Sequence, residues 1–278
     1  MTHAEHKKIR FYSFTFISAF ILQACGGSSQ KSDPSVVTGS VIKGPLENAF
    51  VFLDLNDDGV FSENEPSART NGDGSFSITS DASDVSFVAV TDQNTIDTSS
   101  GEVLENVTLK APAGASVVTP TTTIMKEANI SADEVSRALG LPDGVDPLTF
   151  NPFDDDADAN TSLAVEKISQ QIMTTIKSLG AAAEGAGVAP ARASELATRA
   201  LVENVQSAVT AGQGKVVSFS NEQDIADATS RFLTLVETEE TAVDTTSLVA
   251  VTDILKISIQ NVNQAISEVS SLNDDAST

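Results

Sequence analysis

The sequence predicts an α+β fold in which a small antiparallel β-sandwich is followed by an α-helical bundle. The first half contains short apolar runs rich in Val, Phe, Ile and Thr, separated by Gly and Asp turns, a pattern typical of strands. From residue 119 onward, apolar residues recur at helical spacing over long segments. We therefore expect the sandwich at residues 38–118 and a helical domain at residues 119–278.

The first 24 residues have the composition of an export signal. A cationic stretch at residues 6–10 precedes the apolar run "FYSFTFISAFILQA", which is too short to span a bilayer as a permanent anchor. The next residues, Leu22 to Gly26, resemble the lipobox of bacterial lipoproteins. The resemblance implies that residues 1–24 are a signal peptide, that Cys25 is lipidated, and that Gly26 directs the protein to the outer membrane. Residues 25–37 would then form the lipidated end and a flexible linker.

Composition excludes several classes of function. The chain of 278 residues has a net charge of −23, which opposes binding to nucleic acid. Trp is absent, and His3, His6 and Tyr12 all lie in the predicted signal. The remaining chain therefore has no histidine for a catalytic triad or a histidine-ligated zinc site. We expect a protein that is not an enzyme.

The predicted strands occupy the runs "SVIKG", "AFVFLDL", "SFSITS", "VSFVAV" and "VLENVTLKA". Turn residues separate these runs. Among them, residues 71–74 (Asn-Gly-Asp-Gly) predict a hairpin turn.

Residues 54–65, "DLNDDGVFSENE", have the ligand pattern of an EF-hand calcium loop. Calcium prefers six to eight oxygen ligands, and a 12-residue loop supplies them from positions 1, 3, 5, 7, 9 and 12, with glycine at position 6. Gly59 takes the glycine position, and the other positions fall on Asp54, Asn56, Asp58, the Val60 carbonyl, Ser62 and Glu65. The alternative is a solvated acidic turn. We favour calcium because five crowded acidic side chains repel one another unless a cation is bound.

The flanks of this loop are not helical. The run before Asp54 is strand-like, and Pro66 follows Glu65 directly. An EF-hand sensor needs a helix on each side of its loop. We therefore predict an EF-hand-like loop on a β scaffold, with calcium as a structural clip.

The run "GSVIKGPLENAFVFLDLNDDGVFSENEPSARTNGDGSFSIT" resembles the calcium-loop β-sandwich modules of large bacterial surface proteins. These include the B-type repeats of Ser-Asp-rich adhesins and similar modules in exported proteins of marine proteobacteria. The segments "LKAPAGASVVTPTTTIM" and "ALGLPDGVDPLTFNPFD" resemble what often follows such a module, so the likeness covers about residues 39–156. It implies an extracellular structural or adhesive role with calcium as stiffener, and no catalytic residues.

The second half predicts one short helix and four longer ones. Ser131 and Glu134 form a capping box, and Gly140 closes that helix. The longer helices are expected over residues 162–179, 190–212, 221–237 and 247–272. Thr161 or Asn160 would cap the first of them, Gly180 would end it, and residues 180–189 would form a loop.

A second acidic segment precedes the first long helix. Asp154, Asp156, Asp158 and Asn160 are spaced like alternate calcium ligands, but Ala159 and Val165 replace the required Gly and Glu. Acidic residues are also favoured at a helix N-terminus by the helix dipole. The sequence leaves both interpretations open.

Together these observations predict a lipid-anchored outer-membrane protein with a structural Ca²⁺ site that acts in adhesion, as a scaffold or in assembly. Its expected partners are the membrane, through the anchor, and an envelope protein or surface polymer. One alternative is a binding module for a small ligand or polysaccharide in the helical domain. Another is a hydrolase that uses only Asp and Glu.

Overall fold

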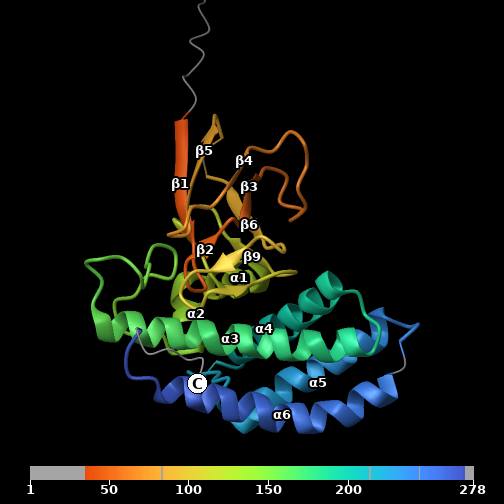
Figure 1. Ribbon diagram of the computed structural model, residues 1–278. Coiled ribbons are helices and arrows are strands. Elements are labelled where there is room, and N and C mark those ends of the chain that lie inside the picture. The colour runs from red at the N-terminus through yellow and green to blue at the C-terminus, as the bar shows by residue number, and fades with distance from the viewer. Residues whose placement is uncertain (1–34, 83, 213, 244, 273–278) are drawn as a thin grey trace, which may run out of the picture. The chain divides into compact units, whose positions relative to one another are not determined.

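The computed structural model describes residues 35–272 except 83, 213 and 244. The predicted signal at residues 1–24, Cys25 and most of the predicted linker lie outside the described residues. The described chain is a mixed α and β protein with ten short strands followed by six helices (Figure 1). Within it, no helix combines the length and apolarity needed to cross a bilayer.

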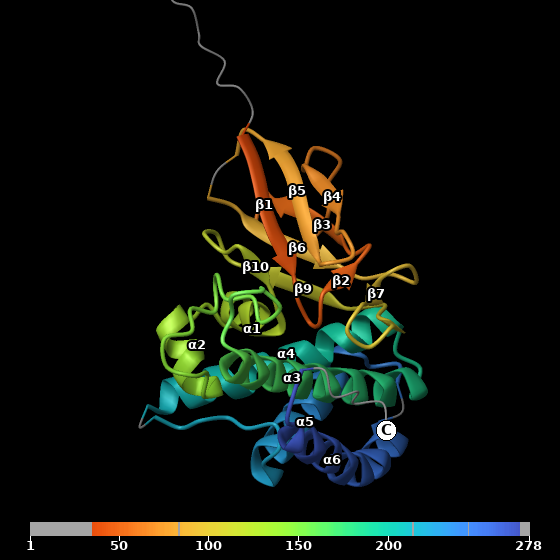
Figure 2. The same cartoon turned by 60° about the vertical axis from the view of Figure 1, so that its left-hand side comes forward.

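The strands form three small sheets (Figures 1 and 2). One sheet has the order β10-β1-β5, another β2-β7-β8, and the third β4-β3-β6-β9. The strands are β1 (Ser35–Val41), β2 (Leu46–Glu47), β3 (Phe50–Asp54), β4 (Ser67–Arg69), β5 (Ser75–Ser80), β6 (Ser86–Val90), β7 (Ile96–Asp97), β8 (Glu102–Val103), β9 (Thr108–Ala111) and β10 (Val117–Val118).

Three details of the strands differ from the prediction. β1 begins at Ser35, inside the predicted linker, because residues 35–37 pair with residues 78–80 of β5. The pairing of β1 with β10 is parallel, whereas a wholly antiparallel arrangement was expected. The turn at residues 71–74 does form, with Gly74 N–H donating to the Asn71 carbonyl at 2.9 Å. However, it joins β4 to β5, which pair with strands of different sheets, so it is not a hairpin turn.

The helices begin directly after the last strand. They are α1 (Pro120–Ala128), α2 (Ala132–Leu139), α3 (Ala159–Gly185), α4 (Pro190–Ala211), α5 (Glu222–Glu239) and α6 (Thr245–Glu268). The predicted capping box at Ser131 and Glu134 is confirmed, and Gly140 closes α2 with φ 66°. Pro190 at the start of α4 and Gly212 at its end are also confirmed.

Helix α1 was not predicted. In its sequence, PTTTIMKEA, three β-branched threonines follow the first residue, and threonine is a poor helix former. Thr119 and Thr122 form a capping box, and the Thr122 hydroxyl donates to the Lys110 carbonyl of β9 at 2.9 Å. The Thr123 hydroxyl accepts from Lys110 N–H at 2.9 Å. Hydrogen bonds to a strand therefore stabilise a helix that its own propensity disfavours.

Two predicted boundaries of α3 are wrong. Asp158 caps the helix by accepting from Thr161 N–H at 2.9 Å, in place of Asn160 or Thr161. The helix also continues past Gly180 to Gly185, because Ala181 to Ala183 are strong helix formers. Gly180 instead lies against α4, where an added Cβ would be 3.6 Å from the Ser194 amide nitrogen.

One apolar core continues from the sheets into the helices. Val51, Leu53 and Leu109 of the strands belong to the same buried cluster as Ile124 of α1 and Leu196 of α4. Figures 1 and 2 show α1 between the sheets and α4. The strands and helices of the described chain thus stabilise each other through shared apolar contacts.

Candidate calcium loop

The candidate loop connects two paired strands. Phe52 of β3 lies opposite Ser67 of β4, and Leu53 N–H donates to the Pro66 carbonyl at 2.9 Å. The expectation of a strand before the loop and another after it is confirmed. The loop is therefore held at both ends by one antiparallel pair.

Asp54, the first predicted ligand, is buried and turned into the loop. Only 5% of its surface is exposed. Its Oδ1 accepts from Asp58 N–H at 3.1 Å, and its Oδ2 accepts from Gly59 N–H at 2.9 Å. Backbone N–H groups thus hold this carboxylate at the position from which an EF-hand-like loop would bind a cation.

Glu65, the last predicted ligand, joins the two ends of the loop. It is also 5% exposed. Its Oε1 accepts from Leu55 N–H at 2.9 Å, and its Oε2 accepts from Ser62 N–H at 2.8 Å. The Glu65 carboxylate therefore links the backbone near the start of the loop to the backbone near its end.

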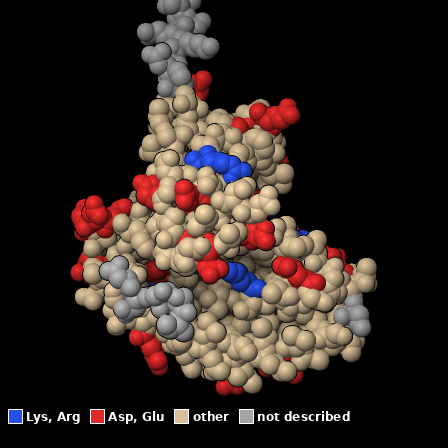
Figure 3. All heavy atoms as spheres, viewed as in Figure 1, with Lys and Arg blue, Asp and Glu red and all other residues tan. Residues whose placement is uncertain are grey.

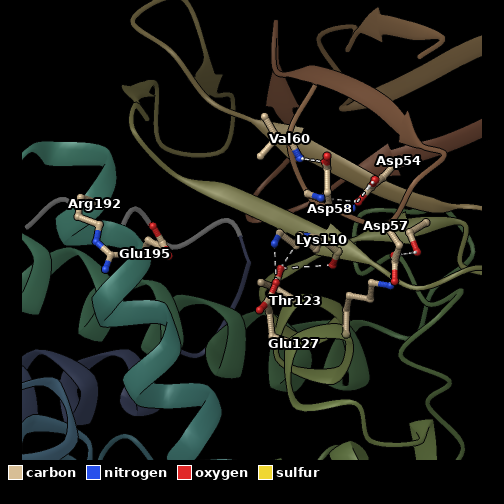
Figure 4. A network of polar contacts seen from close by, with 12 residues as sticks. Asp54, Asp57, Asp58, Val60, Lys110, Thr123, Glu127, Arg192 and Glu195 are labelled. Atoms are coloured by element: carbon tan, nitrogen blue, oxygen red, sulfur yellow. Dashed lines mark hydrogen bonds and ion pairs between the residues drawn. The ribbon is translucent and has the colours of Figure 1, made fainter. Parts of the chain in front are cut away.

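The remaining predicted ligands lie between these two and are more exposed. Asn56 Oδ1 accepts from Asp58 N–H at 3.2 Å, so it shares that N–H with Asp54 Oδ1. Asp58 in turn accepts from Val60 N–H at 2.7 Å and from the Asn56 amide at 2.8 Å (Figure 4). The structure thus brings the oxygens of Asp54, Asn56 and Asp58 to one part of the loop.

The tight bend of the loop needs left-handed backbone. Asp57 has φ 61° and Gly59 has φ 73°, a region that glycine adopts without strain. A Cβ at Gly59 would lie 2.7 Å from Lys110 Nζ, the end of a flexible side chain that can move away. Glycine at the sixth position therefore meets a conformational requirement of the bend.

Phe61 attaches the loop to β3. Its ring makes edge contacts with Phe50 at 5.0 Å and Phe52 at 5.5 Å between centroids. Phe52 is fully buried, whereas Phe61 itself is 42% exposed. Aromatic pairs in this geometry are worth about 0.5–1.5 kcal/mol beyond the area that they bury.

An ion pair that sequence reasoning missed connects the loop to α1. Asp57 Oδ1 lies 2.5 Å from Lys126 Nζ and accepts from the Ser86 hydroxyl at 3.2 Å (Figure 4). The hydrogen bond from Lys126 lowers the pKa of Asp57, against a smaller opposing effect of burial. Asp57 takes the fourth loop position, which supplies no ligand. No local signal could reveal a partner 69 residues away.

An open cleft of about 520 Å³ separates the loop from α1 and the segment that follows it. Asp54, Asp58 and Gly59 line one wall. The other wall includes Lys110, which pairs with Glu127 at 2.6 Å. The loop is thus accessible to solvent on the side of its acidic residues. Figure 3 shows that acidic side chains outnumber Lys and Arg on the face that it draws.

The chemistry of the loop fits a hard cation. The ion pairs formed by the described residues do not include Asp54, Asp58 or Glu65. In the described part of the chain, no three His, Cys, Asp or Glu side chains are grouped closely enough to form a ready metal centre. The carboxylates instead accept hydrogen bonds from the loop backbone. The oxygen-only ligand set is the one that Ca²⁺ prefers.

The second acidic segment has a clear local role at one residue. Asp158 accepts from both the N–H and the hydroxyl of Thr161 at 2.9 Å, and this hydrogen bonding lowers its pKa. Asp154 accepts from the Asn151 amide at 2.7 Å. Asp158 therefore acts as the N-cap of α3, which agrees with the interpretation based on the helix N-terminus.

No protein-family model matches the chain, and searches among curated proteins and solved structures found no significant similarity.

Proposed function

We propose that this chain is a lipid-anchored protein of the bacterial cell envelope in which a bound Ca²⁺ stiffens a small β-sandwich. Its role would be non-enzymatic, in adhesion, as a scaffold or in assembly. The observation that carries the calcium proposal is the burial of Asp54 and Glu65 with only N–H partners and no basic partner among the described residues.

Buried carboxylates are costly unless a cation or strong hydrogen bonds compensate for lost hydration. In this loop, hydrogen bonds to N–H groups provide part of that compensation. A Ca²⁺ ion would bind the remaining lone pairs of Asp54, Asn56, Asp58 and Glu65 together with the Val60 carbonyl. An extracellular module of this kind binds calcium with a Kd of about 10⁻⁴–10⁻³ M.

The sandwich is proposed from the contact between two sheets. Phe76 of β5 and Phe87 of β6 meet edge to face at 5.4 Å, and both are buried. These strands belong to different sheets, β10-β1-β5 and β4-β3-β6-β9. Their apolar side chains supply the shared interior that a sandwich requires. The calcium loop would close one end of this arrangement.

The binding-module alternative receives less support. An apolar hollow beside α3, lined in part by Leu141, Val145 and Phe150, has a volume of only about 10 Å³. Such a space holds about one water molecule, so it does not favour a small ligand at that position.

The calcium proposal is tested by thermal unfolding of residues 26–278 with EDTA or 10 mM CaCl₂. At 10 to 100 times Kd, calcium should stabilise the fold by about 1.4–2.7 kcal/mol, which raises Tm by several degrees. Asp54→Ala combined with Glu65→Ala should abolish the increase. Glu63→Gln, which removes an exposed loop charge outside the ligand set, should retain it.

Two results would contradict this proposal: no calcium-dependent shift in the unmutated chain, or an equal shift in the double variant. The anchor is tested separately by labelling cells with radioactive palmitate. The full chain should incorporate label, and Cys25→Ala should not.

A further inference from the structure

A buried pair of lysine and aspartate lies at the turn between β1 and β2. Lys43 and Gly44 form this turn, which is closed by a bridge between Ile42 and Pro45. Lys43 Nζ lies 2.7 Å from Asp97 Oδ2 of β7, and the two side chains are 12% and 2% exposed. In every other lysine–carboxylate pair of the described chain, the lysine side chain is at least 23% exposed. Lys43 is thus the paired lysine that is best shielded from water.

The Asp97 carboxyl is held in a fixed orientation beside this lysine. Its Oδ1 accepts from the Ser99 hydroxyl at 2.6 Å and from Ser99 N–H at 3.0 Å, so its Oδ2 is left for Lys43. Asp97 pairs with Leu46 of β2, which fixes its backbone. Gly44 permits the close approach, because it has φ 66° and a Cβ there would lie 2.8 Å from Asp97 Cγ. The lysine nitrogen is thus held close to the carboxyl carbon.

A third ionisable side chain, Glu166 of α3, lies at the same turn. Its Oε1 accepts from the Gln170 amide at 2.6 Å, whereas its Oε2 is buried with no hydrogen-bond partner among the described residues. Burial raises the pKa of Glu166 to about 7, and the charge of Asp97 adds to the rise. The charge of Lys43 and a hydrogen bond from Gly44 N–H act in the opposite direction. Glu166 can therefore hold or release a proton near neutral pH, as general acid–base catalysis requires.

The buried position favours loss of charge from the pair of Lys43 and Asp97. Removing two charges from water costs free energy that their mutual attraction can fail to offset. Transfer of one proton from Lys43 Nζ to Asp97 Oδ2 gives a neutral amine and a neutral carboxylic acid without a change of net charge. A desolvated, neutral lysine is a nucleophile. The structure therefore places a nucleophile and an electrophile in direct contact, which removes the entropic cost of bringing them together.

We propose that Lys43 and Asp97 join in an amide bond between their side chains, with Glu166 as the group that transfers protons. The Lys43 Nζ lone pair attacks Asp97 Cγ and forms the N–C bond, while one electron pair of the carbonyl moves onto Oδ1. The two donors of Ser99 stabilise the negative charge that develops there.

Glu166 then completes the reaction by moving two protons. It gives its own proton to the hydroxyl at Oδ2 and takes one from the nitrogen, either directly or through one water molecule. The Cγ–Oδ2 bond breaks, its electron pair leaves with the oxygen, and a water molecule is released. Glu166 ends in its starting protonation state, and no group is oxidised or reduced.

The cross-link would enclose residues 44–96, which include the candidate calcium loop. It joins two residues that are 54 positions apart in the chain. Its formation requires no metal ion, so it goes beyond the proposed stiffening by Ca²⁺ and should proceed equally in EDTA. Failure of the calcium proposal would leave this one standing, and the reverse also holds.

Mass spectrometry tests the bond directly. Residues 26–278 contain the whole compact unit. After purification and overnight incubation at pH 7 in EDTA, the intact chain should weigh about 18 Da less than its sequence requires, because one water is lost. Trypsin should then fail to cut after Lys43 and should yield residues 32–69 joined to residues 70–110. Ring closure at an Asp-Gly step also releases water, but it does not join two peptides.

Matched variants assign the roles of the three residues. Lys43→Arg keeps a cation beside Asp97 but has no amine to react, so it should show no joined peptide. Glu166→Gln should form the joined peptide at least about a hundredfold more slowly than the unmutated chain. Glu184→Gln, at an exposed position of the same helix, should form it at the unmutated rate.

Two results would overturn the proposal or part of it. Absence of the joined peptide from the unmutated chain would overturn the cross-link. Its formation in Glu166→Gln at the unmutated rate would overturn the role of Glu166. Circular dichroism checks that each variant is folded. If Glu166→Gln is not, Ser99→Ala replaces it, since loss of one donor to Oδ1 should slow the reaction at least about tenfold.

Discussion

The candidate calcium loop and the contact region of Asp97 in β7 and Glu166 in α3 bury carboxylates in different ways. In the loop, both oxygens of Asp54 and both of Glu65 accept backbone N–H groups. At the other contact, Asp97 lies 2.7 Å from Lys43 Nζ and accepts from Ser99. Glu166 of α3 has one oxygen bonded to Gln170 at 2.6 Å, while its Oε2 has no hydrogen-bond partner among the described residues.

This difference separates a site suited to negative charge from one that disfavours it. Loop N–H groups stabilise ionised carboxylates, and a cation could bind the lone pairs that remain. Around Glu166, burial raises the pKa to about 7, although the Gln170 hydrogen bond and Lys43 act in the opposite direction and Asp97 adds to the rise. This region therefore pairs Asp97 with Lys43 and holds Glu166 as an acid that is largely neutral below pH 7.

Among the substitutions that probe these two regions, Asp97→Ala should cause the largest loss of folding stability. Asp97 is 1% exposed, and its removal leaves the mostly buried Lys43 without its partner. Breaking a buried ion pair in this way costs about 3–5 kcal/mol. Urea denaturation measures the loss. Asp92→Ala, which breaks the exposed pair with Arg69, should cost less than about 1 kcal/mol. Equal losses of stability in the two variants would show that the buried ion pair between Asp97 and Lys43 stabilises the fold no more than the exposed pair does.

Glu166→Gln should have the next largest effect, and it should depend on pH. The pKa of about 7 for Glu166 in the folded chain lies above its ordinary value of 4.5. The unfolded chain therefore ionises first as pH rises, and the wild-type fold loses stability between about pH 4.5 and 7. Gln cannot ionise, so relative to wild type the variant should be about 2–3 kcal/mol more stable at pH 8 than at pH 5.

Urea titrations at pH 5 and pH 8 measure this change. Glu184→Gln, at an exposed position of the same helix, is the control and should show no such difference. A pH-independent effect of Glu166→Gln would mean that Glu166 is ionised in the fold throughout this range.

Asp57→Asn should have the smallest effect. It removes the ion pair with Lys126, which is partly exposed, so the expected loss is about 0.5 kcal/mol. The loss should disappear as pH falls, because Lys126 lowers the pKa of Asp57 and protonation removes the pair. Calcium-dependent stabilisation should persist, since Asp57 is not a predicted ligand. Loss of the calcium response would show that the pairing with α1, and not the ligand set alone, shapes the site.

Local sequence patterns correctly predicted several features of this chain. The loop pattern at residues 54–65 falls between two strands as expected, and the capping box at Ser131 and Glu134 is present. Each depends on residues a few positions apart, so the sequence contains the whole signal. By contrast, α1 was missed because its stabilising hydrogen bonds reach Lys110 on β9.

The sequence by itself determined the change from strands to helices after Val118, the acidic composition, and the order of oxygen-bearing residues around Gly59. Only the tertiary structure decided that Lys126 meets Asp57 and that α6 turns Ile254 to solvent. It also decided that Glu166 is buried with one oxygen that has no hydrogen-bond partner among the described residues. The physical reason is how far apart along the chain the interacting residues lie. Turns, caps and periodicity act within a few residues, whereas burial and ion pairing depend on segments that folding brings together from tens of residues apart.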